Sequence, residues 1–568
     1  MRATRAVPPL AAAALLAWTL RAAPLQESGS LELYRAQSAT SLAPDSHRDD
    51  RGFAVPPVGE WHWYEGQPGC ESSAIGTAVD AAVRDVTRPG HRARLGDPDW
   101  ITTRRNAFGP TLLDSQAIFT AAARLIETAD SEIDLVSFAM EPDAEPYLEL
   151  VRAFARRIDA GRPLAAPFRI RIYADHLSPL FMGGLARTKA RALLKPWLDL
   201  YLARGLDPER LPLEMYVHAH GGFLYHYGGR YSVHDKLLIV DGRYLHIGGA
   251  NPQAKNNYAR PERDSAVVVK GEVAHSALEA FDTLWADTDF SCGIERRGRE
   301  YRTVCRNRRT PFKVDHDPDV LAPSFDQTGP SASACLPITV LSKRRAGFQN
   351  IAGVNNPWAR GVLAAVSSAS RSIALSSPNM NAPQLQGALV EAMTGRDVTV
   401  RLLVPFDRNE PQVNALGGFG SNERSIGVLK ACAIVARGRS EEDYDRLMRN
   451  FAGRWWVAEG TKVRFSGDGP GCFHTKFASF DDRVLIVGSG NLDDQSFFHS
   501  SETSIVIDDA AVTRAVSGFL FEREWDRGEH FDLSMPFLRF NELRSPLPSD
   551  RLMADAASQC SGLGIRWK

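Results

Sequence analysis

The chain has 568 residues, of which 44% are hydrophobic and 24% are charged, so it can bury a sizeable core and is not a disordered chain. Its 67 Lys and Arg residues are balanced by 68 Asp and Glu residues, for a net charge of -1. This balance disfavours a protein that coats nucleic acid, and the composition excludes collagen-like, coiled-coil and multi-span membrane proteins.

The first predicted element is a short apolar segment at the N-terminus. Arg2 and Arg5 precede an apolar run over residues 6–20. Its length suits the apolar region of a secretory signal peptide better than a spanning helix. We therefore expect residues 1–26 to be a cleaved signal or an uncleaved anchor, with a buried helix as the third interpretation. Both main interpretations place the bulk of the chain outside the cytoplasm, secreted or periplasmic.

An extension is predicted next, over residues 27–100. It contains many turn formers and the aromatic cluster 61–64. We expect it to wrap around the first half of the chain. Contact of the aromatic cluster with a lipid surface is the alternative, because amphipathic rings favour boundaries between water and apolar phases.

The rest of the chain repeats one order of elements. The first half predicts helices over 117–128 and 147–160 and strands over 133–138 and 168–173; the second half predicts helices over 362–369 and 385–394 and strands over 372–377 and 398–404. Short apolar strands that alternate with longer helices predict an α/β class, with parallel or mixed sheets covered by helices. We place the first domain at 101–292, a linker at 293–342, the second domain at 343–535 and a tail at 536–568.

Each half then carries the same composite motif, and the Asn comes 17 residues after the His in both. The first copy contains His234, Lys236, Gly249 and Asn251, and the second contains His474, Lys476, Ser489 and Asn491. An acid follows each copy, Asp264 and Glu502, and a Phe-x-x-x-Trp pair ends each half at 281–285 and 521–525. One such motif is weak evidence, but two copies with matching surroundings exclude chance.

The residue types in this motif suit phosphodiester chemistry. A His and a Lys two residues apart on a strand point to the same face. Two such faces, related by a pseudo-twofold axis, would bring two imidazoles and two ammonium groups into one site. Lysines and Asn amides can hold non-bridging oxygens, while the imidazoles serve the nucleophile and the leaving group.

This pattern resembles the phospholipase D superfamily over roughly residues 105–530. The stretches 373–378, 398–405 and 487–502 look most like its cardiolipin synthase and phosphatidyltransferase branch. Cardiolipin synthases usually begin with two membrane spans, and this chain has one short apolar segment. The resemblance implies two duplicated α/β/α sandwich halves with mixed sheets that share one active site.

The resemblance also implies a mechanism through a phosphohistidine intermediate. His234 is the expected nucleophile and His474 the general acid and base, with the exchanged assignment as the alternative. Phosphate oxygens would be bound by Lys236, Lys476, Asn251 and Asn491, with Gly249 and Ser489 also at the substrate. Asp264 and Glu502 would orient the imidazoles. No metal or other cofactor is implied, because the lysines already supply positive charge.

Two acids within the motif are predicted to have a structural role. Asp241 and Asp481 lie an odd number of residues from their histidines, so on an unbroken strand they would face away from the site. We expect both to fix turns as hydrogen-bond acceptors. Structural roles are also expected for four other histidines, namely His218, His220, His226 and His246.

The expected substrate is a glycerophospholipid at a membrane surface, with water or an alcohol as acceptor and no obligate protein partner. A nuclease or other phosphodiesterase of the same superfamily is the alternative, although the near-neutral charge makes nucleic acid a poor partner. A catalytically silent binding protein is the third hypothesis. The intact His, Lys and Asn residues of both copies argue against it.

Seven cysteines are present, without any Cys-x-x-Cys pair, so a zinc cluster is not expected. Cys292 and Cys305 could close a short loop, although spacing alone leaves the pairing open. A packing role is expected for Cys472.

The Arg-rich stretch 296–309 is expected to be a solvated loop, with attraction to anionic headgroups as the alternative. Asp134 is expected at the exposed end of its strand.

Overall fold

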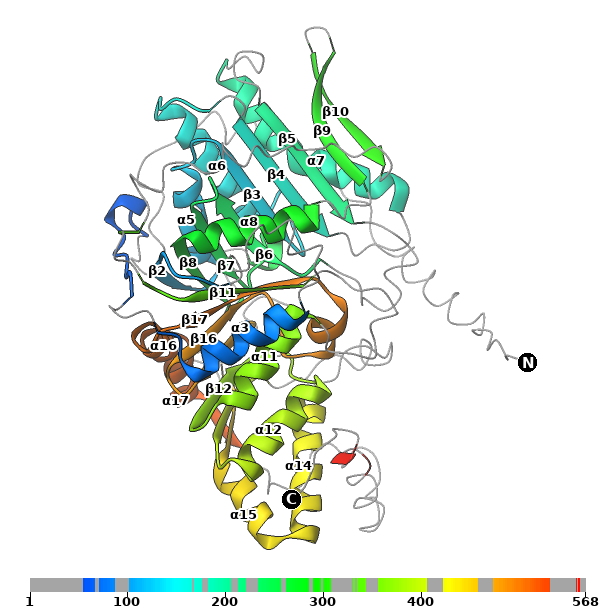
Figure 1. Cartoon of the computed structure of the whole chain (residues 1–568). Helices are drawn as coiled ribbons and strands as arrows, with labels where there is room; N and C mark the ends of the chain where they lie inside the picture. Colours follow the sequence, from blue (N-terminus) through cyan, green and yellow to red (C-terminus); the bar gives the residue numbers. More distant parts are fainter. Residues whose placement is uncertain are drawn as a thin grey trace, which may run out of the picture. The chain divides into compact units, whose positions relative to one another are not determined.

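Two mixed sheets organise the computed structural model of the chain (Figure 1). The structure describes residues 55–66, 71–86, 102–165, 168–175, 182–205, 213–220, 233–256, 262–285, 290–297, 300–307, 330–331, 335–343, 356–405, 422–457, 473–531, 558, 560 and 561. In sheet order, the first sheet contains β10 (Glu300–Asn307), β9 (Phe290–Arg297), β5 (Leu213–His220), β4 (Phe168–Asp175), β3 (Glu132–Ser137), β6 (Lys236–Val240), β7 (Tyr244–Gly248), β8 (Ser265–Gly271) and β2 (Asn106–Leu113).

The second sheet repeats this order. It contains β18 (Glu529–Phe531), β14 (Phe451–Trp455), β13 (Thr399–Val404), β12 (Ser372–Ser376), β15 (Phe477–Phe480), β16 (Val484–Gly488), β17 (Glu502–Asp508), β11 (Ile338–Lys343) and β1 (Thr102–Thr103). Strands β3, β4 and β5 are parallel neighbours in the first sheet, as β12, β13 and β14 are in the second. The predicted α/β class with mixed sheets is therefore confirmed, and the shared order of the inner strands agrees with the predicted duplication.

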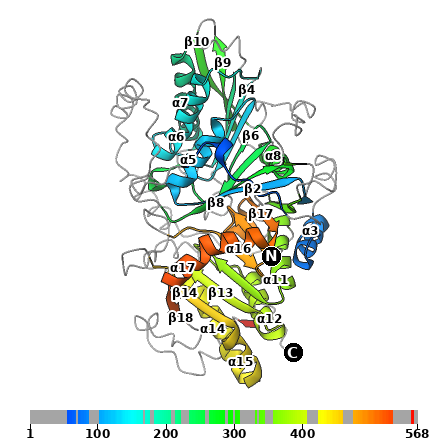
Figure 2. The ribbon, with the colours of Figure 1, turned by 90° about the vertical axis from the view of Figure 1, so that its left-hand side faces the viewer.

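Helices cover the sheets and form three apolar cores. One core joins the first sheet to α5 (Ser115–Ile126), α6 (Glu145–Asp159) and α7 (Met182–Ala203), which lie on one face of that sheet (Figure 2). A second core joins the second sheet to α11 (Pro357–Ser368), α12 (Pro383–Gly395), α14 (Asn422–Arg439) and α15 (Glu441–Asn450). The third contains side chains of both sheets together with α8 (Glu272–Trp285), α16 (Ala510–Ser517) and α17 (Arg523–Arg527). This shared core ties the two halves together.

The predicted helices and strands agree with these elements to within two residues at each end, with one exception. Helix α11 begins at Pro357, earlier than the predicted residue 362. The Asn356 side chain accepts a hydrogen bond from Ala359 N, and Pro357 occupies the first turn. This cap explains the early start, because Asn and Pro both favour the beginning of a helix.

The N-terminal extension contacts both halves, and not the first half alone. Val58 and Trp61 belong to the core of the first half, and Tyr64 pairs with Phe108 of β2. Helix α3 (Ala74–Val86) instead packs on α11, with Ile75 and Val83 in the core of the second half. Among the described residues of the extension, Val58 and Trp61 therefore meet the expectation of packing on the first half, whereas α3 does not.

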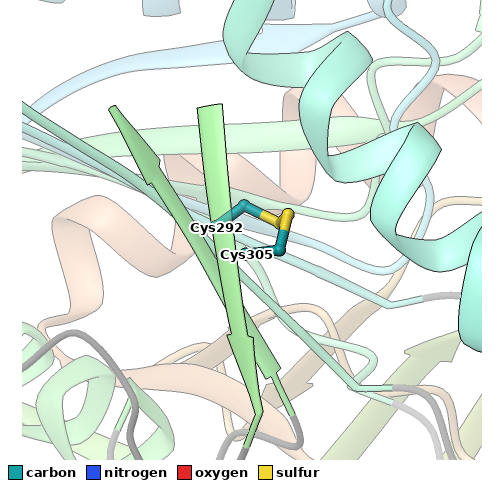
Figure 3. Close-up of a disulfide and its surroundings, with 2 residues drawn as sticks. All are labelled: Cys292 and Cys305. Atoms are coloured by element: carbon teal, nitrogen blue, oxygen red, sulfur yellow. A yellow bond between two sulfur atoms is a disulfide. The ribbon is translucent and has the colours of Figure 1, made fainter. Parts of the chain in front are cut away.

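The predicted linker at 293–342 is wrong at both ends. Strands β9 and β10 form an antiparallel hairpin at the edge of the first sheet, and β11 already belongs to the second sheet. Cys292 and Cys305 lie opposite each other in this hairpin and form a disulfide (Figure 3). The exposed Arg302 and Arg306 lie on β10, so these two arginines are solvated on a strand and not in a loop.

Asp134 is fully buried, contrary to the expectation of an exposed strand end. Its carboxylate lies 2.6 Å from Nε of Arg171 on the neighbouring strand β4. Arg171 is buried as well, and its guanidinium lies 4.7 Å from the ring centroid of Phe281 and 5.5 Å from that of Trp285. A buried charge thus has its partner on the adjacent strand, which the single-strand pattern could not reveal.

Several expectations fall outside the described residues. These are the signal or anchor at 1–26, the segment 27–54, His226, Cys472 and most of the tail at 536–568. The side chains of His218 and His220 are also outside them, while His246 is buried in β7. Among the helices that are described, none is both long enough and apolar enough to cross a bilayer.

Candidate active site

The motif histidines lie where the two halves of the chain meet. His234 N donates a hydrogen bond to Ser501 O (3.1 Å), and His474 N donates to Arg263 O (2.9 Å). In each case the accepting residue directly precedes the acid that follows the other copy of the motif. The backbone of each half therefore fixes the histidine of the opposite half.

The side chains repeat this exchange between halves. His234 Nδ1 lies 2.8 Å from Oε1 of Glu502, and His474 Nδ1 lies 2.6 Å from Oδ2 of Asp264. Both histidines are at most 8% exposed, and both carboxylates are fully buried. The predicted pairing of each imidazole with an acid is present, and each pair crosses between the halves. A single site built from both copies of the motif follows from this geometry.

The motif lysines are buried beside the histidines. Lys236 Nζ donates to His234 O and Lys476 Nζ donates to His474 O, each at 2.6 Å. Burial lowers the pKa of Lys236 to about 7; Glu502 opposes this effect and Lys476 adds to it. A phosphate dianion or diester placed between these ammonium groups would be attracted by both, which suits the predicted role of the lysines.

Burial also keeps His234 uncharged at neutral pH. The pKa of His234 is lowered to about 4, chiefly by loss of hydration, although Glu502 raises it. Burial alone would raise the pKa of Glu502, but His234, Lys236 and the Ser489 hydroxyl lower it to about 2. Glu502 is therefore ionised and accepts the Nδ1–H of a neutral His234. This tautomer leaves the Nε2 lone pair available for reaction.

Asp264 is ionised for a similar reason. Burial opposes its charge, but Lys476 and His474 lower its pKa below the ordinary value. Its second oxygen, Oδ1, accepts from Ser265 N at 2.8 Å. Both imidazoles thus face a buried carboxylate that remains charged.

Gly249 and Ser489, which are predicted to lie at the substrate, both contact these carboxylates. A Cβ on Gly249 would lie 2.1 Å from Asp264 Oδ1, and Gly249 N already donates to Ser265 O. Ser489 Oγ donates to Glu502 Oε2 at 2.6 Å. The physical reason is that a buried carboxylate needs both space and hydrogen-bond donors.

The two motif asparagines are held differently. Asn251 Oδ1 accepts from Ser137 Oγ (2.8 Å) and from Ala139 N (3.3 Å). Asn491 Nδ2 instead lies 3.2 Å from Asp493 Oδ2, and Asn491 Oδ1 is buried with no partner among the described residues. The side-chain oxygen of Asn251 therefore accepts hydrogen bonds from the protein, whereas Asn491 uses its side-chain nitrogen to donate one.

Asp241 and Asp481 have the predicted structural role. Asp241 accepts from the backbone N–H groups of residues 130, 131 and 132, and Asp481 accepts from those of residues 370, 371 and 372. Both acids adopt positive φ angles, 55° and 54°, as turn residues often do. They fix the chain before β3 and β12 and lie away from the imidazoles.

Some residues at the site were not foreseen from the sequence. Ser496 Oγ donates to Glu502 Oε1 at 2.6 Å. The Phe138 ring meets the His234 imidazole edge-on, with centroids 5.2 Å apart, and lies 5.5 Å from Lys236 Nζ. Phe138 follows β3 directly, so its place at the end of a central strand is the signal that could have found it.

One group of three side chains in the described part of the chain has metal-ligating atoms close together. Glu262, Asp264 and His474 place such atoms within 4.8 Å of one another. However, Lys476 Nζ lies 2.8 Å from His474 Nδ1 and 3.9 Å from Asp264 Oδ2. An ammonium group already supplies positive charge at this position, so the donor set does not fit a divalent ion well.

The repeated mixed sheets and the crossed His–carboxylate pairs define a protein with two copies of one motif that meet in a single shared site. Residues 362–525 match the family described as "Cardiolipin synthase, PLD-like domain". This stretch of the second half therefore resembles a phospholipase D-like domain, which agrees with the resemblance that the motif predicted.

Three solved structures are similar to parts of this chain. Phosphatidylserine synthase from Haemophilus influenzae Rd KW20 is 12% identical, with a TM-score of 0.49 over 81% of this chain and 95% of that one. NucT from Helicobacter pylori is 14% identical (TM-score 0.24, 34% of this chain and 99% of that one). Nuc from Salmonella typhimurium, a phospholipase D family member, is 16% identical (TM-score 0.22, 34% and 97%). No curated protein matches the sequence.

Proposed function

We propose that the protein hydrolyses or exchanges the headgroup phosphodiester of glycerophospholipids through a phosphohistidine intermediate. The observation that carries this proposal is the pair of crossed contacts, His234–Glu502 and His474–Asp264. They place two oriented imidazoles at the junction of the halves, each backed by a buried carboxylate. Two-step transfer needs two such groups, one that forms the covalent bond and one that moves the proton.

In the first step, His234 Nε2 forms a bond to phosphorus while the bond to the headgroup oxygen breaks. The neutral state of His234 supports its role as nucleophile. His474, protonated at this stage, donates its proton to the departing alkoxide. In the second step, neutral His474 accepts a proton from water or an alcohol, whose oxygen displaces His234 from phosphorus. The exchanged assignment of the histidines uses the same atoms.

Lys236 and Lys476 would hold the non-bridging phosphate oxygens and stabilise the charge that develops on them. Both are buried beside the histidines. Binding of the anionic diester favours the ammonium form of Lys236, because it adds a negative charge next to a group whose pKa is lowered to about 7. Substrate binding would thus help to charge the group that binds it.

A lipid substrate is favoured over a nucleic acid by the charge balance of the chain, which is -1 overall. An extracytoplasmic location is part of the proposal. The Cys292–Cys305 disulfide supports it, because disulfides persist in oxidising compartments.

The test compares His234→Ala and His474→Ala with wild type, and His530→Ala serves as the control. His530 is an exposed histidine on β18. Purified proteins are incubated with mixed phospholipids plus ethanol and, separately, with single-stranded DNA, and the products are identified by mass. We expect phosphatidic acid or phosphatidylethanol from wild type and the control, and at least about a thousandfold less from the two site variants.

Three outcomes would overturn parts of this proposal. Full activity in either site variant removes the two-histidine mechanism. Products from DNA but not from lipid assign the protein to the nuclease alternative. Loss of activity on chelation of divalent metals, restored by adding metal, contradicts a mechanism based on lysine.

A further inference from the structure

A buried lysine lies behind the His234–Glu502 pair, outside the repeated motif. Lys343 is the last residue of β11 and lies opposite Glu502, the first residue of β17, in the register of the second sheet. Only 4% of Lys343 is exposed. Its Nζ donates to the backbone oxygen of Ser496, in the helical turn Gln495–His499.

Three buried carboxylates, Glu502, Asp493 and Asp235, interact electrostatically with this lysine, and Asp235 lines the same small cavity as Lys343. Asp493 comes from the loop after β16, and Asp235 comes from the first half of the chain, between His234 and Lys236. The three acids are at most 3% exposed. A cluster of this kind is stable only when cations offset its charge, because burial strongly disfavours isolated ions.

Each of these acids contacts the site or its support. Glu502 accepts from His234 Nδ1 at 2.8 Å. Asp493 Oδ2 lies 3.2 Å from Asn491 Nδ2. Asp235 accepts from the hydroxyls of Ser501 and Thr503, next to Glu502 on β17. Through these acids, the Lys343 ammonium group acts electrostatically on both His234 and Asn491.

Lys343 also holds the turn that carries a donor to Glu502. Ser496 Oγ donates to Glu502 Oε1 at 2.6 Å, while Ser496 O accepts from Lys343. Ser496 N in turn lies 2.8 Å from Asp493 Oδ1. The lysine thus acts on Glu502 in two ways, through charge and through the position of Ser496.

We propose that Lys343 is a positioning residue for the reaction: it keeps Glu502 ionised and in place, and so maintains the reactive tautomer of His234. This inference rests on the proposed function of His234. The charges that face Lys343 support it. Burial lowers the pKa of Lys343 to about 7, and the surrounding acids oppose this effect. Burial also raises the pKa of Asp235 to about 6. The cations around Asp235 therefore do not fully offset the cost of burying its charge.

The first half of the chain has no lysine at the position equivalent to Lys343. The residue that follows β2 and donates its N–H to Asp264 O is Asp114. Its carboxylate lies 2.7 Å from Arg263 Nη1, and Arg263 also contacts Glu524 of the second half. The position equivalent to Lys343 therefore carries an acid in an interface ion pair. Lys343 serves His234 and not His474, which makes the two histidines unequal.

The test uses Lys343→Met, Lys343→Arg, Asp235→Asn and the double variant Lys343→Met/Asp235→Asn. Lys195→Met, which removes an exposed lysine, is the control. The pH profile of kcat/KM for phospholipid turnover and the melting temperature are measured for each protein. Without the ammonium, Glu502 takes up a proton at higher pH. We therefore expect the acidic limb of the kcat/KM profile of Lys343→Met to shift to higher pH than in wild type, by at least about one pH unit.

If Lys343 acts by compensating charge, removal of the Asp235 charge should rescue Lys343→Met. If Lys343 only fills space, it should not. Lys343→Arg should keep the wild-type pH profile. Removing the Asp235 charge should raise the melting temperature of Lys343→Met and move its acidic limb back toward wild type. Parallel pH profiles for wild type and Lys343→Met, or melting temperatures that change additively, would overturn the inference. If wild type turns over no lipid, the proposed function fails, and the melting temperatures still decide whether Lys343 compensates Asp235.

Discussion

Replacing Glu502 with Gln isolates the carboxylate behind His234. Glu502 is fully buried and accepts from His234 Nδ1 (2.8 Å), Ser489 Oγ (2.6 Å) and Ser496 Oγ (2.6 Å). Gln has the same shape, but it is neutral and brings an N–H₂ donor into a site built from donors. His234 would lose the anion that holds its Nδ1–H, and the tautomer with a free Nε2 lone pair would no longer be favoured.

The size of the effect follows from the electrostatics of the site. The surroundings of Glu502 lower its pKa from 4.5 to about 2, which corresponds to about 3 kcal/mol of preference for the ionised form. If the transition state depends on that charge, the same energy corresponds to at least about a hundredfold fall in kcat/KM. Positive charge that develops on His234 as it is phosphorylated would increase the loss.

The assay measures kcat/KM for phospholipid turnover in Glu502→Gln, wild type and Glu522→Gln. Glu522 is a half-exposed glutamate that pairs with Arg401 at 2.6 Å, so the control makes the same chemical change away from the histidines. Melting temperatures establish that each variant is folded. A folded Glu502→Gln protein that keeps more than about a tenth of wild-type kcat/KM would refute the reasoning, because its anion would then contribute less than about 1.4 kcal/mol.

Two further predictions concern stability. Arg171→Met leaves Glu132 and Asp134 buried without their cation and should lower the free energy of unfolding, measured with denaturant, by about 3–5 kcal/mol. Arg401→Met, at the equivalent and more exposed position of the second half, should lower it by about 1 kcal/mol or less. Equal losses in the two variants would contradict this prediction. Between pH 6.5 and about 4, folded His234 binds fewer protons than the unfolded chain, so stability should fall with decreasing pH, by up to about 3 kcal/mol from this residue. Melting temperatures at pH 7.5 and 4.5 should show a smaller difference in His234→Gln than in wild type, and an equal difference would exclude this contribution.

Local patterns in the sequence predict the central strands and helices well. Strands β3, β4, β12 and β13 are short segments in which apolar residues recur and most residues are buried, a pattern that favours a strand in the interior of a sheet. The β9–β10 hairpin was missed because its residues are rich in arginine and lack an apolar run. Its pairing depends on the edge of β5 and on the Cys292–Cys305 disulfide, which are properties of the folded sheet.

The residues of the site could be identified from the motif, but not their pairing. Asp264 and Glu502 each follow the histidine of their own half, and the spacing gives no sign that each serves the other half. The crossing depends on contacts between chain segments more than 200 residues apart. Lys343 and Ser496 were missed for the same reason, since neither belongs to a repeated pattern and both reach Glu502 only in the folded protein.

The crossed pairs also bear on why the two halves remain together. A half on its own would carry a His without its carboxylate and a buried carboxylate without its His, so each half would leave a charge uncompensated. His234 and Glu502 offset each other's burial only across the junction, as do His474 and Asp264. The shared apolar core supplies the contact area, and the buried His–carboxylate hydrogen bonds penalise any arrangement that displaces one sheet relative to the other. The interactions that orient the imidazoles for catalysis are therefore also interactions that specify how the two sheets assemble.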